Sequence, residues 1–509
     1  RSGLESYYEK VLMGQRGIQY LIKDHRNRLV GSYERGELDE KPVSGRGLET
    51  YIDVELQQLA EKLLRNKVGA VVAIEPQTGG ILAMASGPSF NPNELTGASF
   101  KKTYSKLVLD VSGPLLNRAI KGQYPPGSTF KPIGGLVALD QGVITPSFGY
   151  PCQGLYYGCG HGKPACTHKN PGHANSLRLA IANSCNPYFA HVYRLTVDNP
   201  RMGGVKKGYA KWEQYMNDFG LGKPLGIDLP SEDRGNIPDT SAYNKEYRGA
   251  WNSCTNLTLG IGQDKMLSTP LQLANAMCII ANKVYYYTPH FVRKIEDETP
   301  EDAIMQPFRV KHEVLTHISD TAFNAVIRGM NDVVVSGTAR SAALPGINVC
   351  AKTGTAENFR ILDGRKIKLK DNAVFVSFAP MENPKIVIAV VVENGGYGGV
   401  AAGPISSLLM EKYLNDTLRT ERLQEVEKIS NTDFMPSYLP RLQYIEDSAR
   451  AFRWFKITKD SNYIRKYLRR TTAPAPKEPQ APKNKIVYHK PDLIEPEKII
   501  LLKKKNPTT

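Results

Sequence analysis

Short apolar runs separated by turn sequences mark two pairs of strands that lie far apart in the chain. Residues 70–75 (AVVAIE) and 81–86 (ILAMAS) flank the sequence PQTGG, and residues 373–379 (AVFVSFA) and 385–393 (KIVIAVVVE) flank PMENP. Runs of this length around a Pro- or Gly-containing turn are typical of β-hairpins. We expect both hairpins to belong to one antiparallel sheet.

Helical patterns occupy much of the remaining chain. Asp53 is placed to cap a helix over VELQQLAEKLL, whose leucines form one apolar stripe. Residues 268–282 and 320–334 are also typical of helices, and both lie between the two hairpins. The pattern therefore predicts an α+β fold, in which a sheet built from distant hairpins carries a helical insertion.

Composition divides the chain into four predicted segments. Residues 1–50 are charged and punctuated by glycine, with no evident core, whereas residues 51–415 contain the strands and helices described above. Residues 416–470 are charged and helix-like, and we expect them to form a helical C-terminal extension. Residues 471–509 begin TTAPAPKEPQAPKNK, a Pro- and Lys-rich stretch that we expect to be disordered.

The overall composition fits a soluble globular protein with more than one structural unit. Of the 509 residues, 41% are hydrophobic and 23% are charged, and this length exceeds what one compact core accommodates. The net charge of +16 permits an anionic membrane surface or a nucleic acid as partner, but many of the basic residues lie after Arg450. Because no basic stretch there alternates with aromatic and glycine residues, we expect no nucleic-acid binding.

The sequence contains no transmembrane helix and no signal peptide. Its longest apolar run, residues 386–392, has strand length, whereas a membrane span needs about 18 residues or more. There is no initiator methionine, so we expect a fragment or a processed chain from which any membrane anchor is missing.

Three short motifs occur in the order S-x-x-K, S-x-N and K-T-G. Their residues are Ser128 and Lys131, then Ser184 and Asn186, then Lys352, Thr353 and Gly354. This order with wide spacing is typical of penicillin-binding proteins and class A β-lactamases. A second S-x-x-K at Ser99 lacks the preceding glycine turn and the following apolar helix, so the first motif is assigned to Ser128.

The first two motifs suit acyl transfer by a serine nucleophile. An alcohol attacks an amide poorly at neutral pH, and Lys131, one helical turn after Ser128, is positioned to take its proton. Lysine acts as a base only when neutral, which burial and a second cation such as Lys352 would favour by lowering its pKa. Ser184 can then relay a proton to the departing amine, while Asn186 holds the donor amide. The alternative is that Ser128 merely caps a helix.

The third motif suits binding of an extended substrate. A strand over K-T-G-T would present its backbone edge, with Gly354 allowing close approach. Thr353 and Thr355 would offer hydroxyl groups to a terminal carboxylate. We therefore predict Thr353, Gly354 and Thr355 as substrate-binding residues.

These motifs lie within longer blocks that resemble class B penicillin-binding proteins over about residues 45–415. The blocks are YIDVELQQLAE, VAIEPQTGGILAMASGPSFNPN, LNRAIKGQYPPGSTFKP, LGIGQDKMLSTPLQLANA, GINVCAKTGTAEN and VSFAPMENPKIVIAVVVENGG. The NRAIKGQYPPGSTFK block is most similar to the elongation-type branch, penicillin-binding protein 2. The resemblance implies a five-stranded antiparallel sheet flanked by helices, with a helical subdomain and the active site between them.

The resemblance also implies the activity and the roles of the residues. Ser128 would be the acylated nucleophile and Lys131 the general base, with the backbone amides of Ser128 and Thr355 as oxyanion hole. Stem peptides ending in D-Ala-D-Ala would be cross-linked during cell elongation, and β-lactams would acylate the same serine. The reaction needs no cofactor. One departure from the family is Asp264 in GIGQDKM, where glycine is usual.

Location and partners follow from the same resemblance. The family implies an inner-membrane anchor by an N-terminal helix, missing here, and a catalytic domain in the periplasm. Residues 1–50 would be the remnant of an N-terminal pedestal domain, and a SEDS-type membrane glycosyltransferase is the expected partner. Three rival functions stay open: a serine β-lactamase, a D,D-carboxypeptidase and a non-enzymatic β-lactam sensor. The E-x-x-L-N motif of class A β-lactamases is not found between Asn186 and Lys352.

A Cys- and His-rich loop over residues 151–175 precedes the second motif. It carries Cys152, Cys159, His161, Cys166, His168 and His173, and the S-x-N motif adds Cys185. Such clusters are typical of structural zinc sites, and some elongation-type relatives are thought to bind zinc in the matching loop. We predict Cys152, Cys166, Cys185 and either His168 or His173 as ligands, with the other histidine and Cys159 as spare ligands. The alternatives are a disulfide between Cys152 and Cys166, and loop residues with no connection to one another.

Overall fold

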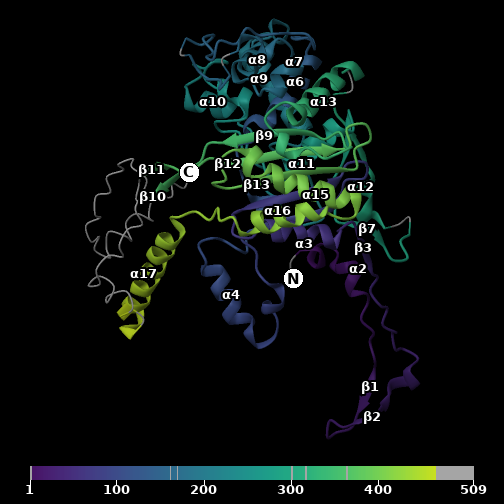
Figure 1. The fold of residues 1–509 in the computed structure, drawn as a ribbon. Coiled ribbons are helices and arrows are strands. Elements are labelled where there is room, and N and C mark those ends of the chain that lie inside the picture. The colour runs from purple at the N-terminus through teal and green to yellow at the C-terminus, as the bar shows by residue number, and fades with distance from the viewer. Residues whose placement is uncertain are drawn as a thin grey trace. The chain divides into compact units, whose positions relative to one another are not determined.

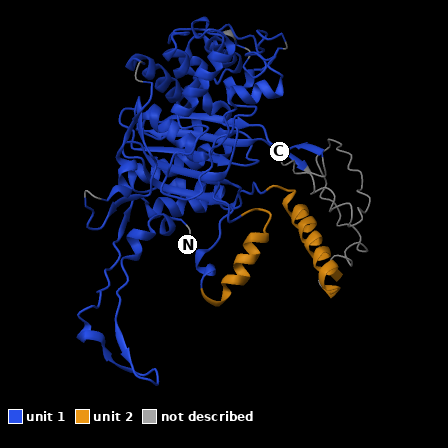
Figure 2. Ribbon diagram, turned by 180° about the vertical axis from the view of Figure 1, so that it is seen from behind, with its two compact units in different colours: residues 1–96, 114–435 blue, residues 97–113, 436–509 orange. Residues whose placement is uncertain are grey.

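The computed structural model forms two compact units (Figure 2). It describes residues 3–160, 162–168, 170–299, 302–315, 318–362, 365–462 and 464–465. The predicted tail at 471–509 and His161 lie outside the described residues. The first unit comprises residues 1–96 and 114–435, and the second comprises residues 97–113 and 436–509.

The centre of the first unit is a five-stranded antiparallel sheet with the order β5-β4-β13-β12-β9 (Figure 1). The strands are β4 (Gly69–Glu75), β5 (Gly80–Gly87), β9 (Cys350–Ala356), β12 (Asn372–Ala379) and β13 (Ile386–Val392). Both predicted hairpins and the single antiparallel sheet are confirmed. Strands β12 and β13 are buried along their whole length, which explains why their sequences are apolar without alternation.

Helices cover the sheet. Helix α11 (Pro270–Ala281), all twelve residues of which are buried, packs against β4, β12 and β13. Helix α3 (Val54–Leu63) packs against β5, and α15 (Gly403–Asn415) packs against α3, β12 and β13 (Figure 1). The predicted cap of α3 is confirmed, because the Asp53 carboxylate accepts a hydrogen bond from the N–H of Leu56.

A helical subdomain lies alongside β9, which forms one edge of the sheet (Figure 1). It is built from α6 (Lys131–Asp140), α7 (Leu177–Ala182), α8 (Asn186–Val197), α9 (Val205–Asp218) and α13 (Asp320–Val335). Helix α6 packs on α8, α13 packs on α7, and α13 also contacts β9. The predicted helix at 320–334 is confirmed, and the subdomain is joined to the sheet through α13.

Shorter elements connect these layers. The further helices are α5 (Arg118–Lys121), α10 (Thr240–Glu246), α12 (Gln306–Arg309), α14 (Gly398–Ala401) and α16 (Thr420–Asn431), with 3-10 turns at Pro92–Leu95, Pro171–Ala174, Pro200–Met202, Leu257–Ile261, Ala303–Met305 and Arg340–Ala342. The further strands are β6 (Tyr285–Tyr287) with β8 (Lys311–Glu313), and β10 (Phe359–Leu362) with β11 (Arg365–Lys368).

The N-terminal segment packs on a later part of the chain. It contains α1 (Leu4–Tyr7), α2 (Glu9–Met13), β1 (Leu21–Lys23), β2 (Leu29–Ser32), a 3-10 turn at Tyr33–Gly36 and β3 (Leu48–Thr50), which pairs with β7 (Val292–Ile295). Tyr8 is fully buried, and its hydroxyl donates to the Asp228 carboxylate at 3.1 Å. Asp228 also accepts from the backbone N–H groups of Phe291 and Val292. Tyr8 and Val11 also share a small core with Val292, Ile295, Met305 and Phe308. The assignment of the segment as a pedestal remnant stays a prediction.

The second unit consists mainly of two helices, α4 (Phe100–Leu109), which follows a 3-10 turn at Gly97–Ser99, and α17 (Leu439–Thr458). Gln443 joins them, because its side chain donates to the Leu109 carbonyl at 3.2 Å and accepts from the Val111 N–H at 3.0 Å. Among the residues described, no helix is both long and apolar enough to cross a membrane.

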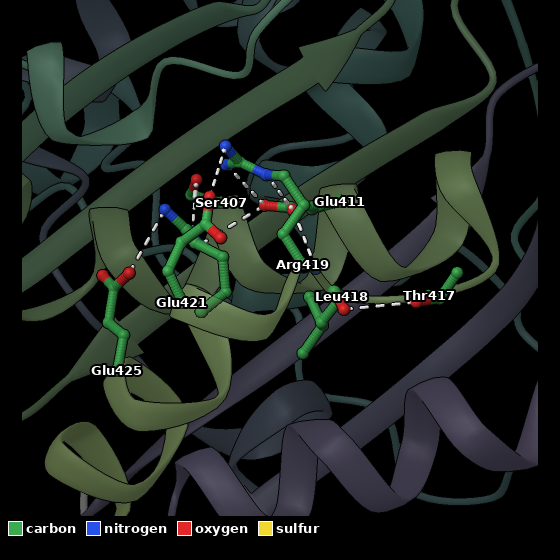
Figure 3. Close-up of polar contacts among 8 residues, drawn as sticks. Ser407, Glu411, Thr417, Leu418, Arg419, Glu421 and Glu425 are labelled. Atoms are coloured by element: carbon green, nitrogen blue, oxygen red, sulfur yellow. Dashed lines mark hydrogen bonds and ion pairs between the residues drawn. The ribbon is translucent and has the colours of Figure 1, made fainter.

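A buried glutamate fixes the start of α16 to α15 (Figure 3). Glu411 is 1% exposed, and its carboxylate pairs with the Arg419 guanidinium at 2.7 Å and with Arg422 at 3.3 Å. Burial alone would raise the pKa of Glu411, but hydrogen bonds from Arg419 and the charge of Arg422 hold it below its ordinary value. The far end of α16 is held by the buried Lys67, whose ammonium donates to the carbonyls of Ile429 and Thr432.

Replacement of Glu411 by glutamine is expected to destabilise the first unit by about 3 kcal/mol, because the mostly buried Arg422 would lose its buried charge partner. The free energy of unfolding in urea would measure the change. Glu425→Gln is the matched control, since Glu425 also pairs with Arg422 but is 32% exposed, and its loss should cost less than about 1 kcal/mol. Equal effects of the two changes would contradict the role given to Glu411.

Candidate active site

Ser128 lies in a tight turn that leads into α6. The turn is a 3-10 helix over Gly127–Phe130, and α6 begins at Lys131 with Pro132 in its first turn. The N-cap position of α6 belongs to Phe130 and has no side-chain cap, so the alternative that Ser128 serves as a helix cap is wrong. Ser128 is partly exposed, whereas Thr129 and Lys131 beside it are fully buried.

Two glycines allow this turn to pack closely against its neighbours. Gly127 has φ +56°, and a Cβ there would lie 2.9 Å from the Thr355 carbonyl oxygen. Its N–H donates to the Gly262 carbonyl at 2.7 Å. Gly262 has φ +71°, and a Cβ on it would lie 2.3 Å from the Gly127 carbonyl oxygen. Only glycine fits both positions, which brings Ser128 beside β9.

Lys131 is the centre of the site. Its Nζ donates to the side-chain oxygen of Asn186 at 2.6 Å, to the Ser184 carbonyl at 2.7 Å and to the Ser184 hydroxyl at 3.1 Å. Complete burial lowers the pKa of Lys131 to about 7, and negative charge on Cys185 and Cys166 opposes this shift. A substantial fraction of this amine is therefore neutral near pH 7, as a general base requires.

Lys352 approaches the same hydroxyl from β9. It is fully buried, and its Nζ donates to the Ser184 hydroxyl at 2.9 Å and to the Thr353 carbonyl at 3.2 Å. Burial and the nearby charge of Lys131 lower the pKa of Lys352 well below its ordinary value. The Ser184 hydroxyl thus joins two amines, and this arrangement can pass a proton between them.

The second motif lies at the junction of α7 and α8. Ser184 adopts φ +54°, a left-handed conformation that is uncommon for a residue with a side chain. This turn directs both its carbonyl and its hydroxyl at Lys131. Asn186 begins α8, and its amide nitrogen donates to the Ala165 carbonyl at 2.8 Å. The Cys-rich loop therefore holds the second motif directly, a contact that the sequence alone did not predict.

The third motif forms the edge strand of the sheet, as predicted. A Cβ on Gly354 would lie 2.9 Å from both the Pro126 carbonyl oxygen and the Thr129 methyl group, so the Ser128 turn packs directly on this glycine. The hydroxyl of Thr353 hydrogen-bonds with that of Thr338 at 2.8 Å. This arrangement places the Ser128 turn and the hydroxyl groups of the motif next to one another.

Two residues that lie beside β9 were not identified from the sequence. One is Thr338, the partner of Thr353, which no local motif marks. The other is Gln263, whose side-chain amide donates to the Thr355 carbonyl at 3.0 Å. Gln263 lies in the sequence GIGQDKM, which resembles a family block, and this resemblance could have marked Gln263 as a site residue. The next residue is Asp264, which stands where the family usually has glycine. Asp264 adopts φ +71°, a backbone conformation that glycine adopts most readily.

Four of the predicted metal ligands lie together. The ligand atoms of Cys152, Cys166, His173 and Cys185 are all within 4.8 Å of one another. A hydrogen bond between the two thiols lowers the pKa of Cys166 well below its ordinary value and, together with burial, raises the pKa of Cys185. His168 is outside this set, with its Nδ1 3.9 Å from the Cys166 sulfur.

The disulfide of this region involves other cysteines. Cys159, considered a spare ligand from the sequence, pairs with Cys254, 95 residues later. Cys152 and Cys166, the predicted alternative pair, are both free thiols. The disulfide therefore leaves the four clustered ligands intact.

The rejected S-x-x-K motif lies in the other unit. Ser99 precedes α4 and Lys102 lies within it, and both are exposed. The residues of the second and third motifs all belong to the first unit. Only Ser128 and Lys131 therefore share a unit with them.

Comparisons with known proteins agree with this geometry. The model of the penicillin binding protein transpeptidase domain matches residues 69–411. The peptidoglycan D,D-transpeptidase MrdA of Haemophilus influenzae is 34% identical over 442 residues, which cover 84% of this chain and 64% of that protein. This chain thus spans less than two thirds of that relative.

Solved structures show the same similarity. Pseudomonas aeruginosa PBP2 in complex with WCK 5153 is 33% identical, with a TM-score of 0.63, covering 75% of this chain and 79% of that one. PBP2 of Helicobacter pylori in complex with MreC is 28% identical, with a TM-score of 0.68, covering 82% of this chain and 73% of that one.

Proposed function

Because this chain belongs to the penicillin-binding protein transpeptidase family, we propose that it is a peptidoglycan D,D-transpeptidase that acts through an acyl intermediate on Ser128. The resemblance found in the sequence is thereby confirmed at the level of the family and the fold. The observation that carries the activity is the buried Lys131 amine, which contacts Ser184 and Asn186 one helical turn after Ser128.

The proposed acylation step uses Lys131 as base. The neutral amine takes the proton of the Ser128 hydroxyl as its oxygen attacks the carbonyl carbon of the penultimate D-Ala. The backbone N–H groups of Ser128 and Thr355 stabilise the oxyanion that forms. The proton then passes from Lys131 through the Ser184 hydroxyl to the departing D-Ala nitrogen as the C–N bond breaks.

Deacylation reverses the proton path. The amine of a neighbouring stem peptide attacks the acyl-serine, gives up a proton through Ser184 and Lys131, and restores the Ser128 hydroxyl. Lys352 keeps Ser184 oriented, and the hydroxyl groups of Thr353 and Thr355 bind the terminal carboxylate of the donor. Asn186 holds the donor amide. The residues named here supply every proton transfer, so the chemistry needs no cofactor.

Product analysis separates this proposal from its rivals. With a donor peptide ending in D-Ala-D-Ala and an amine acceptor, a transpeptidase releases D-Ala and forms a cross-linked product. D-Ala release without cross-linked product would indicate a carboxypeptidase. Acylation by penicillin without any D-Ala release from the donor peptide would indicate a sensor. Rapid hydrolysis of penicillin would indicate a β-lactamase. The last three outcomes each contradict the proposed function.

Acylation is expected to accelerate as the pH rises through about 7, the pKa to which burial lowers Lys131. Protonation removes the base, so kcat/KM for penicillin should fall about tenfold per pH unit below about 6 and level off above about 8. Rates measured between pH 5 and 9 provide the test. A profile that stays flat through this range would contradict the assignment of Lys131 as base.

The proposed location is the periplasmic face of the inner membrane. Peptidoglycan substrates lie there, and the Cys159–Cys254 disulfide fits an oxidising compartment. The similar PBP2 of Helicobacter pylori was solved with MreC. For this chain we propose an elongation complex that includes a SEDS-type membrane glycosyltransferase.

We further propose that Cys152, Cys166, His173 and Cys185 hold one structural zinc ion. Three sulfurs and one imidazole nitrogen are a common zinc ligand set, and a tetrahedral site places its ligand atoms about 3.5–3.8 Å apart. The Nδ1 of His173 hydrogen-bonds with the Asn170 carbonyl and the Nε2 lies 3.5 Å from the Cys166 sulfur, which suits ligation through Nε2. The ion would stabilise the Cys-rich loop, whose Ala165 carbonyl accepts a hydrogen bond from the Asn186 side chain.

Protein purified without chelator is expected to contain about one equivalent of zinc. Cys166→Ser should remove most of that zinc, because each structural ligand contributes strongly to affinity. Cys278→Ser is the matched control, since Cys278 is also a buried free thiol but lies outside the cluster. Metal-free, fully active protein with a Cys152–Cys166 disulfide would contradict the zinc assignment.

A further inference from the structure

A basic two-stranded ribbon follows β9 with only two residues between them. Strands β10 and β11 pair antiparallel, with Phe359 opposite Lys368 and Ile361 opposite Lys366. Residues 359–370 contain five basic residues and one acidic residue. Figures 1 and 2 show the ribbon projecting from the sheet. Its charge therefore suits a carboxylate-bearing ligand.

One face of this ribbon combines positive charge with exposed apolar surface. Residues opposite each other in an antiparallel pair share a face, so Phe359, Ile361, Lys366 and Lys368 lie together. Phe359 is 41% and Ile361 72% exposed, and the Lys366 Nζ lies 4.2 Å from the centroid of the Phe359 ring. We name these four residues the ribbon face. It offers two ammonium groups beside apolar side chains.

The base of the ribbon is fixed to the sheet next to the active site. The Asn358 side chain donates to the side-chain oxygens of Asn372 at 3.0 Å and Asn394 at 3.3 Å. The backbone carbonyl of Asn358 accepts from the Leu369 N–H at 2.9 Å. Phe359 is four residues after Thr355, which limits their separation to about 14 Å. The ribbon face is therefore within reach of a peptide bound along β9.

The proposed function fixes the direction in which such a peptide runs. The donor carboxylate lies toward Thr353 and the reacting carbonyl at the N–H of Thr355, so the chain upstream of the reacting carbonyl continues past Ala356. An extended peptide advances about 3.3 Å per residue. Stem residues two to four positions before the reacting D-Ala would therefore reach the ribbon face.

We propose that the ribbon face binds the upstream, carboxylate-bearing residues of the donor stem peptide. The inference rests on the proposed function and adds a second recognition site to it. Lys366 and Lys368 pair with peptide carboxylates, while Phe359 and Ile361 cover the aliphatic parts of the stem. The ribbon thereby selects acidic donor stems over neutral ones.

The test compares an acidic donor peptide, the same peptide with its upstream carboxylates amidated, and a fluorescent penicillin, which lacks the upstream stem. In the variant Lys366→Gln/Lys368→Gln, kcat/KM for the acidic peptide should fall roughly three- to tenfold, mainly through KM, as expected for one or two exposed charge pairs. The amidated peptide should react equally slowly with both proteins. Penicillin acylation should stay within about twofold of wild type, since small exposed substitutions leave the site intact.

The matched control is Lys101→Gln/Lys102→Gln, which removes the same charge from two exposed lysines of α4. It should leave all three rates unchanged. An acidic-peptide rate in the ribbon variant equal to wild type, with normal penicillin acylation, would overturn the ribbon proposal alone. A wild-type protein that penicillin does not acylate would overturn the proposed function, and the ribbon proposal with it.

Discussion

Replacement of Ser128 by alanine is expected to abolish covalent labelling by penicillin and release of D-Ala from donor peptides. The acyl bond forms on this hydroxyl, and no other group can replace it, so the loss should be at least about 10⁴-fold. Ser128 is partly exposed in its turn, and removal of one oxygen leaves the packing of Gly127 and Gly354 unchanged. Gel fluorescence after incubation with a fluorescent penicillin, together with D-Ala assay, measures both losses.

The control for this change is Ser99→Ala. Ser99 begins the other S-x-x-K motif and lies in the second unit. Its replacement should leave labelling at the wild-type level. Labelling that survives in Ser128→Ala, or disappears in Ser99→Ala, would contradict the choice between the two motifs.

Replacement of Lys131 by methionine is expected to slow acylation about 10³-fold, the range found when a general base is removed. Methionine fills most of the same buried space and adds no charge. It leaves the Ser128 hydroxyl without a base and the Ser184 carbonyl and Asn186 oxygen without their donor. Stopped-flow measurement of penicillin acylation, beside a thermal unfolding curve, separates lost chemistry from lost structure.

Lys121→Met provides the comparison, because Lys121 is exposed at the end of α5. Its acylation rate should match wild type. A folded Lys131→Met protein that is acylated at the wild-type rate would show that another group takes the proton of Ser128.

The sheet and the long helices could be predicted because burial determines their sequences. Strands covered on both faces need continuous apolar runs such as residues 386–392, and α11 is mostly apolar because all its residues are buried. The order of the three motifs was equally informative, since each motif supplies a group that acyl transfer by a serine needs. These features depend on local sequence and could be found without a structure.

Features that depend on distant parts of the chain could not be predicted. The Cys159–Cys254 disulfide joins segments 95 residues apart, and only the fold shows that His173, not His168, lies with the three cysteines. The left-handed conformation of Ser184 is imposed by the junction of two helices. The pairing of α4 with α17 in a separate unit likewise joins residues more than 300 positions apart.

The most direct test of the central claim is the intact mass of the protein after incubation with penicillin, followed by mapping of the modified peptide. We predict a single adduct of one drug molecule, located on the side-chain oxygen of Ser128. Folded protein without an adduct, or with its adduct on another residue, would contradict the account.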